Sequence, residues 1–472
     1  MYRQQHEFLV RWLNSKNRKP LIIRGARQVG KSTLVEMFAQ EQSLPLMNVN
    51  LERFSGLGEV FASNDPKQII NSIEMLPRMP ERRDTSLLFL DEIQAAVQAI
   101  PALRYFHEEL PQLPLIGAGS LLEFALSDHK FSMPVGRVQY LHMGPMTFSE
   151  FLLALGEKKL YQIVTGYSLH DAIPALAHQR LLQLLRQYYF VGGMPEAVAA
   201  FVETGSLQAV SEVHNSIIDT CREDFPKYGS RRNLNRMLTV FNFVARNAGA
   251  KVKYSNISRD EQTATLKKDL ELLCMARVAS KVVHSHCSGL PLQASLNEKT
   301  YKLLFLDVGL MNAVCGLNGQ SILQMDEQRL VNEGAIAEQF IGQHLQALLA
   351  DTPNRELTYW LREGRSSNAE VDYVLALSGR VVPIEVKSGA TGSMKSLHQF
   401  VGEKQLAGGQ QVMGQKPTSL AVRFDASLPS VTDVQATISR NKQTESVRYS
   451  LYSLPLYLVE RLKQIIEAAS EE

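Results

Sequence analysis

The strongest constraint on the fold is an apolar run that leads into a glycine-bounded loop and then into an amphipathic helix. The apolar run covers Leu21–Ile23, and the helix begins at about Gly30. Between them, the residues from Gly25 to Ser32 match the pattern G-x-x-x-x-G-K-[ST]. A buried strand, a tight loop and a helix in this order predict the opening of a parallel α/β sheet.

This loop has the chemistry of a phosphate-binding site. Glycines let backbone N–H groups turn inward around a phosphate chain, Lys31 places a positive charge on the β- and γ-phosphates, and the Ser32 hydroxyl can ligate Mg²⁺. The helix N-terminus adds its free amides and its dipole to the same anion site. We therefore predict that ATP with Mg²⁺ is bound by the loop residues Gly25, Ala26, Arg27, Gln28, Val29, Gly30, Lys31, Ser32 and Thr33.

A second apolar run ends in two acidic residues. Leu87–Leu90 is typical of a central strand buried on both faces, and Asp91 and Glu92 follow it directly. Open α/β sheets bind ligands at the carboxyl ends of their strands, so both carboxylates are expected beside the phosphates. We expect Asp91 to hold the Mg²⁺, directly or through water, and Glu92 to polarise the water that attacks the γ-phosphate. The alternative is a strand that stops at an ordinary acidic turn.

Two further residues are candidates for the same site. Ser120 ends the next apolar strand, where it is either a sensor of the γ-phosphate or water, or the N-cap of the following helix. Arg137 precedes a short strand, where it either supplies charge to the phosphates or lies on the surface. The residues alone leave both choices open.

Length and composition bound the class of protein. A chain of 472 residues with 45% hydrophobic and 21% charged residues is expected to be globular and to form two to four domains. Its formal net charge of +2 argues neither for nor against nucleic acid. The four cysteines form no C-x-x-C pair, and no apolar run reaches the roughly 20 residues of a membrane helix. We therefore expect a cytoplasmic protein with no membrane partner.

Residues 235–292 differ from the helical region before them. Two short helices and then a strand are predicted here, which is the order of a winged helix. Arg259, Lys267 and Lys268 would then be available to DNA phosphates. The alternative is a winged helix that serves only as a packing module inside an ATPase.

The last third of the chain carries another set of acidic residues. Asp372 lies on the second of three predicted strands, and Glu385 and Lys387 lie two apart on the third, so they share a face. Two carboxylates and a lysine at one edge suit metal-dependent phosphodiester hydrolysis, with Asp372 and Glu385 holding Mg²⁺ or Mn²⁺ and Lys387 orienting water. Glu338, on a preceding helix, is the candidate that completes the metal set.

The alternative for this set is a structural salt-bridge network with no activity. Two carboxylates close together repel, and a buried carboxylate is costly unless it is paired. Arg362 or Lys395 could fold over the carboxylates and supply the positive charge. The residues alone do not decide between a metal and such a network.

Together these motifs resemble the prokaryotic AAA-type ATPases that join a P-loop core to a carboxyl-terminal domain of long-unassigned function. The resemblance covers nearly the whole chain and is carried by Gly25–Ser32, Leu90–Gln94, Gly136-Arg137, Gly144–Leu152, Gly192–Glu196, Phe305–Leu310, and Glu370–Asp372 with Ile384–Lys387.

The resemblance implies more about both halves of the chain. The ATPase half is similar to the signal-transducing (STAND) group, in which a Gly-x-Pro turn lies near the nucleotide base, so Pro195 is implied in nucleotide binding. The last third is similar to the PD-(D/E)XK nuclease fold, whose motif is intact at Asp372, Glu385 and Lys387.

The expected fold is α/β in four segments. These are a P-loop core with a parallel sheet over residues 1–165, a helical lid over 166–234, a winged helix over 235–292 and a mixed α/β, restriction-endonuclease-like domain over 293–472.

Two functions follow as hypotheses. The first is a Mg²⁺-dependent ATPase that acts as a nucleotide-gated switch on DNA, on a protein partner or through self-association. The second is an ATP-regulated, metal-dependent DNA nuclease, with defence against foreign DNA as one role.

Overall fold

The computed structural model describes residues 1–127, 134, 136–228, 234–317, 333–352, 355–363, 368–389, 393–407, 419–440 and 443–471. The chain divides into two compact units. Unit 1 comprises Met1–Met146 with Glu271–Val278, and unit 2 comprises Thr147–Leu270 with Ala279–Glu472. The predicted end of the ATPase segment, at residue 165, therefore lies inside unit 2.

Aromatic packing explains why unit 2 begins at Thr147. The Thr147 side chain caps a helix in a capping box with Glu150, and the helix places Phe148 beside Tyr188 and Phe340, with ring centroids 5.8 and 6.3 Å away. These contacts tie the helix to residues much later in the chain. The sequence pattern was helical here, but it did not reveal these partners.

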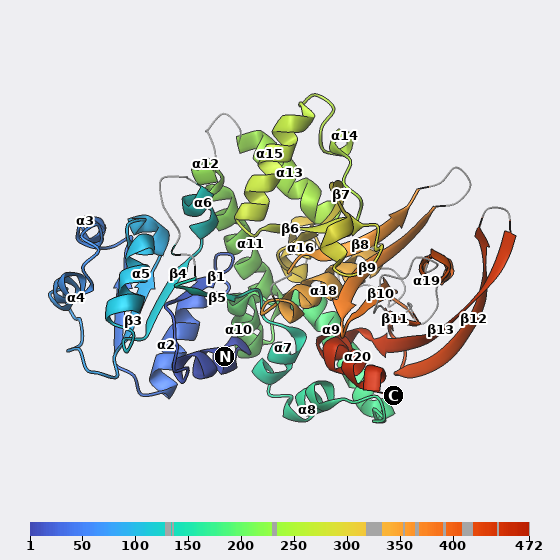
Figure 1. The fold of residues 1–472 in the computed structure, drawn as a ribbon, viewed down its shortest axis with the longest axis horizontal. Helices are drawn as coiled ribbons and strands as arrows, with labels where there is room; N and C mark the ends of the chain where they lie inside the picture. Colours follow the sequence, from blue (N-terminus) through green and yellow to red (C-terminus); the bar gives the residue numbers. More distant parts are fainter. Residues whose placement is uncertain are drawn as a thin grey trace. The chain divides into compact units, whose positions relative to one another are not determined.

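Unit 1 is built on a parallel sheet with the strand order β2-β3-β4-β1-β5 (Figure 1). Its central strands are continuous apolar runs because both faces are covered, and Leu87–Leu90 is fully buried. The predicted α/β fold with a parallel sheet is confirmed. Its strands are β1 (Leu21–Arg24), β2 (Leu46–Asn50), β3 (Leu87–Asp91), β4 (Leu115–Gly119) and β5 (Gln139–His142).

Helices connect these strands. The Asp65 carboxylate accepts hydrogen bonds from the amides of Lys67 and Gln68 and so caps the helix that begins at Pro66. The helices of this part of the chain are α1 (Gln5–Leu13), α2 (Lys31–Glu41), α3 (Leu57–Phe61), α4 (Pro66–Glu74), the 3-10 helix η1 (Ile93–Ala96), α5 (Ala99–Glu109) and α6 (Leu122–Ser127).

Unit 2 opens with helices. They are α7 (Phe148–Ala154), α8 (Lys158–Gly166), α9 (Ala175–Val191), α10 (Pro195–Thr204), α11 (Leu207–Glu223), α12 (Phe225–Tyr228), α13 (Leu234–Arg246), α14 (Tyr254–Ile257) and α15 (Thr263–Met275), whose last residues belong to unit 1. Later come η3 (Leu292–Ser295), α16 (Val308–Val314), α18 (Glu333–Leu348), α19 (Lys395–Ala407), η5 (Leu456–Arg461) and α20 (Leu462–Glu471).

The strands of unit 2 form one mixed sheet with the order β12-β13-β11-β10-β9-β8-β6-β7 (Figure 1). The hairpin β6-β7, which follows α13, α14 and α15 in the chain, pairs with β8 and so belongs to this same sheet. The strands are β6 (Ala279–Ser285), β7 (Leu296–Phe305), β8 (Leu357–Arg362), β9 (Ala369–Leu377), β10 (Arg380–Val386), β11 (Leu420–Asp425), β12 (Ser430–Arg440) and β13 (Gln443–Pro455).

One stretch of the chain contains, in order, α18, β8, β9, β10, α19 and β11. The strands β8, β9 and β10 pair antiparallel, and β11 pairs parallel with β10. Leu397, Phe400 and Val401 of α19 are buried in one cluster with Val371 and Val374 of β9. The hydrophobic contacts thus hold α19 against the strand that carries Asp372.

In the described part of the chain, every helix is too short or too polar to cross a lipid bilayer.

Candidate nucleotide site and carboxylate cluster

The loop between β1 and α2 requires glycine at two positions. Gly30 has a φ of 88°, in the left-handed region that residues with a side chain rarely adopt. A Cβ atom at Gly25 would lie 2.2 Å from the Met143 carbonyl oxygen. The loop therefore has its tight shape because only glycine fits there. Gln28 also has a positive φ, of 61°.

Lys31, the first residue of α2, is buried, and its hydrogen-bond partners among the described residues are neutral. Its ammonium donates to the carbonyl oxygens of Gly25 at 3.2 Å and Ala26 at 2.7 Å. Burial lowers the pKa of Lys31 to about 8, although the charges of Glu92 and Asp91 oppose this shift. A buried ammonium without a direct anionic partner is suited to receive an anionic ligand.

Ser32 and Asp91 meet although they are far apart in the sequence. The Ser32 hydroxyl donates to the Asp91 carboxylate, with its oxygen 3.1 Å from Oδ1 and 3.0 Å from Oδ2. Burial raises the pKa of Asp91, and the bond from Ser32 opposes the rise. A hydroxyl and a carboxylate in contact are hard oxygen donors, which fits a Mg²⁺ ion held by these two side chains.

Glu92 has a strained backbone, and hydrogen bonds fix the position of its side chain. Its φ of 52° is unusual for a residue other than glycine, and such outliers gather at functional sites. Gln94 Nε2 donates to Glu92 Oε2, and the Ser120 hydroxyl donates to the same oxygen at 3.2 Å. Three residues of the prediction, Asp91, Glu92 and Ser120, are thus brought together with Ser32 at one edge of the sheet.

Arg137 lies elsewhere, and this corrects its placement at the phosphates of its own chain. Gln139, which begins β5, pairs with Leu21, which begins β1, so Arg137 lies at the amino edge of the parallel sheet. The phosphate loop follows Arg24, at the opposite edge. Arg137 Nε instead forms an ion pair with Glu108 at 2.9 Å.

The turn that contains Pro195 is held by a buried aspartate of unit 2. Pro195 is the first residue of α10. Just before it, the Gly193 amide donates to Asp307 Oδ2 at 2.7 Å, and a Cβ atom at Gly192 would lie 2.0 Å from Asp307 Oδ1. Two motifs that were identified separately in the sequence therefore meet here, and contact of Pro195 with a nucleotide stays a prediction.

In the second half of the chain, Asp372 and Glu385 lie on adjacent antiparallel strands, as predicted. Tyr373 of β9 pairs with Ile384 of β10, and Asp372 and Glu385 are the next residues on their strands. Asp372 Oδ2 accepts a hydrogen bond from the Val386 amide at 2.8 Å, and Lys387 Nζ donates to Glu385 Oε1.

Lys302 on β7, which the sequence analysis missed, is the centre of this carboxylate cluster. Its side chain is 1% exposed, and its Nζ lies 2.8 Å from Glu338 Oε1 and 3.8 Å from Asp372 Oδ1 and also pairs with Glu370. The signal in the sequence was a lysine beside the apolar run Leu303–Phe305, since a buried lysine needs anionic partners.

Arg362 and Lys395, the cations named as alternatives, do not take this role. Arg362 pairs with Glu403 at 2.7 Å, and the charge beside Asp372 comes from Lys302. Lys395 is exposed at the start of α19.

The carboxylate cluster, defined as Glu338, Glu370, Asp372 and Glu385 with Lys302 and Lys387, has shifted pKa values. Burial raises the pKa of Glu338 to about 8 and that of Glu385 to about 7. Burial alone would lower the pKa of Lys302, but Glu338, Asp372 and Glu370 outweigh burial and raise it. The raised pKa values of Glu338 and Glu385 favour protons on these carboxyl groups, and the raised pKa of Lys302 keeps its ammonium charged.

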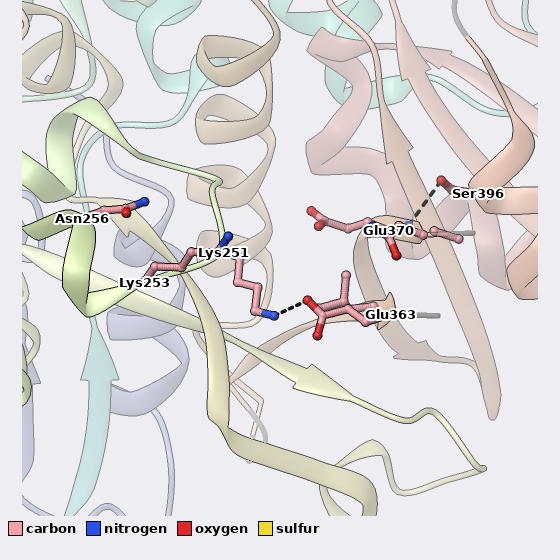
Figure 2. A pocket seen from close by; sticks show the side chains of 9 residues that line it. Lys251, Lys253, Asn256, Glu363, Glu370 and Ser396 are labelled. Atoms are coloured by element: carbon pink, nitrogen blue, oxygen red, sulfur yellow. Dashed lines mark hydrogen bonds and ion pairs between the residues drawn. The ribbon is translucent and has the colours of Figure 1, made fainter. Parts of the chain in front are cut away.

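A pocket of about 520 Å³ adjoins the carboxylate cluster (Figure 2). Glu370 lines it together with Lys251, Lys253 and Glu363, and Figure 2 shows the ion pair between Lys251 and Glu363. Opposite charges face each other here, so the pocket does not favour an anion over a cation. Glu370 is the member of the cluster that reaches this pocket.

The predicted DNA-facing residues Arg259, Lys267 and Lys268 are exposed, on and just before α15. Exposure is compatible with a role in phosphate binding but also with a solvated helix face. Contact with DNA stays a prediction.

Family models match three parts of the chain. Residues 17–152 match a family described as an AAA domain, so unit 1 carries a P-loop AAA-type ATPase core. Residues 182–321 and 333–427 match two domains of unknown function, DUF8612 and DUF4143. A search among curated proteins found no match.

Two solved structures are similar to part of the chain. The ORC2 protein of Aeropyrum pernix, in ADPNP and ADP complexes, is 14% identical with a TM-score of 0.33, over 68% of this chain and 96% of that one. The Thermotoga maritima RuvB Holliday junction branch migration motor is 17% identical with a TM-score of 0.27, over 59% of this chain and 88% of that one. With TM-scores this low, neither structure serves as a guide to the function of this chain.

Proposed function

We propose that the protein is a Mg²⁺-dependent ATPase that works as a nucleotide-gated switch. The observation that carries this proposal is the contact of the Ser32 hydroxyl with both oxygens of Asp91, beside a buried Lys31 whose hydrogen-bond partners are carbonyl oxygens. The AAA domain match over residues 17–152 supports the choice of ATP.

Each residue of the site has a part in this function. Lys31 exchanges its two carbonyl partners for the β- and γ-phosphate oxygens, a stronger charge-assisted interaction. Ser32 and Asp91 would hold Mg²⁺, which neutralises charge on the phosphates when it is bound. Glu92 orients the attacking water and accepts its proton. Ser120 binds the Glu92 carboxylate, so it can link the state of the γ-phosphate to the position of Glu92.

The test is the isosteric variant Glu92→Gln in the full chain. We expect ATP binding to be retained and turnover to fall by about 100-fold or more, because the amide cannot accept the proton. Calorimetry measures binding, and phosphate release measures turnover. Glu59→Gln, at a surface position in α3, is the matched control. Turnover of Glu92→Gln at the wild-type rate would contradict the assignment of Glu92 as the base.

The output of the switch is proposed to lie in unit 2, on DNA or on a protein partner. The order of α13, α14, α15 and the hairpin β6-β7 supports a winged helix, and exposed Arg259, Lys267 and Lys268 are the residues that would meet DNA phosphates. Fluorescence anisotropy with labelled duplex DNA, with and without ATP, tests this. A triple alanine variant that binds DNA as wild type does would remove the winged helix from the proposal.

The second candidate function is a metal-dependent DNA nuclease. The adjacent positions of Asp372 and Glu385, with Lys387 bonded to Glu385, favour it, since these are the three residues of the motif that the resemblance implies. The lysine partners of the carboxylates count against it. Incubation with plasmid and with single-stranded DNA, with Mg²⁺ or Mn²⁺ and with or without ATP, separates the two functions.

A further inference from the structure

The carboxylate cluster of unit 2 lies where a nuclease of the resembled fold would hold its metal ion, so the fit of a metal can be examined directly. Within the described residues, no three His, Cys, Asp or Glu side chains are placed to hold one metal ion together. The side chains that fill the space between the carboxylates are lysines. The metal that the resemblance implies therefore does not fit the cluster in this arrangement.

Lys302 has the position and the partners of a central cation. Its ammonium contacts carboxylates from two elements, Glu338 of α18 and both Glu370 and Asp372 of β9, and it lies 5.0 Å from the Tyr359 ring centroid of β8. A metal ion bridging α18 and β9 would have to occupy this same space. Lys302 and a metal ion that bridges α18 and β9 therefore exclude each other.

The backbone around Lys302 encloses its ammonium together with the Glu338 carboxyl group. The residue is 1% exposed, and its strand is bridged on one side to Lys251. Gly249, which precedes that bridge, has a φ of 77°, and a Cβ atom there would lie 2.8 Å from the Glu338 carboxyl carbon. The backbone at Gly249 thus packs directly against the Glu338 carboxyl group, with which Lys302 is paired.

We propose that Lys302 is the permanent cation of the carboxylate cluster, and that it excludes a divalent metal ion and joins the hairpin β6-β7 to α18 and β9. The inference is independent of ATP hydrolysis, which uses residues of unit 1. It implies that unit 2 of this chain does not cut nucleic acid by metal catalysis. It also implies that one side chain, Lys302, is what keeps a metal ion out of the carboxylate cluster.

One atom shows where the cluster could still accept a metal ion. Glu385 Oε2 is buried and has no hydrogen-bond partner among the residues that the structure describes, while its other oxygen is bound by Lys387. A divalent ion between Glu385 Oε2 and Asp372 would also have to tolerate Lys302, 3.8 Å from Asp372 Oδ1. The experiment must therefore test for a metal ion at Asp372 both in the wild-type chain and in a variant without Lys302.

The test counts Mn²⁺ ions bound by the full chain, by calorimetry and by the loss of the free Mn²⁺ electron paramagnetic resonance signal. Wild type and Asp372→Asn are expected to bind the same number, since any ion at Ser32 and Asp91 is common to both. Lys302→Met is expected to bind one Mn²⁺ ion more than wild type. The double variant Lys302→Met, Asp372→Asn is expected to lose this additional ion. Lys299→Met, an exposed lysine on the same strand, is the matched control and should bind as wild type does.

Two results would overturn the proposal. One is a wild-type chain that binds one Mn²⁺ more than Asp372→Asn, because a metal then coexists with Lys302. The other is a folded Lys302→Met chain that gains no Mn²⁺ at millimolar concentration. If Lys302→Met does not fold, the comparison of wild type with Asp372→Asn still decides the matter. A failure here leaves the ATPase untouched, because ATP turnover is measured through Glu92.

Discussion

The nucleotide site of unit 1 and the carboxylate cluster of unit 2 contain the same types of side chain in opposite states. Both have a buried lysine and carboxylates that follow or lie on strands. In unit 1, Lys31 is bonded to carbonyl oxygens, and burial lowers its pKa to about 8. In unit 2, Lys302 is bonded to carboxylates, and its pKa is raised.

The difference indicates which site is ready for a ligand. A lysine whose partners are neutral keeps a charge that an anion can neutralise, so its site gains when phosphate arrives. A lysine that is already paired with carboxylates has no such gain, and it removes the need for a metal ion as well. The same types of residue therefore indicate a binding site in unit 1 and a structural network in unit 2, and the partners of the lysine make the difference.

Removal of the lysine charge in unit 2 should have the largest effect on stability. Lys302→Met leaves Glu338, Asp372 and the partly exposed Glu370 without the lysine that pairs with them, which is expected to destabilise unit 2 by about 3 to 5 kcal/mol. Urea unfolding, followed by the fluorescence of Trp360 in a Trp12→Phe background, measures it. Lys299→Met, on the same strand, is the control. An unchanged unfolding midpoint for Lys302→Met would show that the cluster does not depend on its lysine.

Removal of the lysine charge in unit 1 should affect binding and leave the fold intact. Lys31→Met is expected to weaken Mg-ATP binding by about 100-fold, from two charge-assisted contacts of about 1.5 kcal/mol each. It should not destabilise unit 1, because the hydrogen-bond partners of Lys31 in the described part of the chain are neutral carbonyl oxygens. Calorimetry and thermal unfolding measure the two effects, with the exposed Lys67→Met as control. Unfolding of unit 1 by Lys31→Met would break the comparison.

The pH dependence of ATP binding should follow Lys31. In the free protein this lysine loses its proton at about pH 8, whereas bound phosphates keep it charged. Affinity is therefore expected to be level below pH 8 and to fall above it, by at most about tenfold per pH unit. Calorimetry in buffers of different ionisation enthalpy should detect proton uptake on binding above pH 8. Affinity that rises with pH in this range would refute the assignment.

The smallest effect is expected at an exposed ion pair beside the carboxylate cluster. Glu363 pairs with Lys251 at the rim of the pocket, and its side chain is 63% exposed. Water screens such a pair, so Glu363→Gln should leave the thermal unfolding temperature within experimental error of wild type. Glu338→Gln, inside the cluster, is the matched comparison and should lower it. Equal shifts for both variants would mean that burial does not distinguish the two pairs.

Much of unit 1 could be predicted from sequence because its signals are local. The phosphate loop is contiguous, and an apolar strand that ends in Asp91 and Glu92 must place both at the carboxyl edge of a parallel sheet. Asp372, Glu385 and Lys387 were also found, since β9 and β10 are joined by a short turn. In these cases a short stretch of chain determines which side chains share an edge or a face.

Arg137 was misplaced because its position depends on direction within the sheet. The residue lies just before β5, and the parallel pairing of β5 with β1 puts the start of that strand at the edge opposite the phosphate loop. A motif of glycine and arginine carries no information about which edge it will reach.

The sequence by itself determined the P-loop core and the place of its phosphate loop, since strand, loop and helix are consecutive and each has its own local pattern. Only the tertiary structure decided that Lys302 fills the space between Glu338, Glu370 and Asp372, and that Asp307 holds the turn at Gly193. The physical reason is that these contacts join segments far apart in the chain, where hydrophobic periodicity sets which face is buried but not which charged group it will meet.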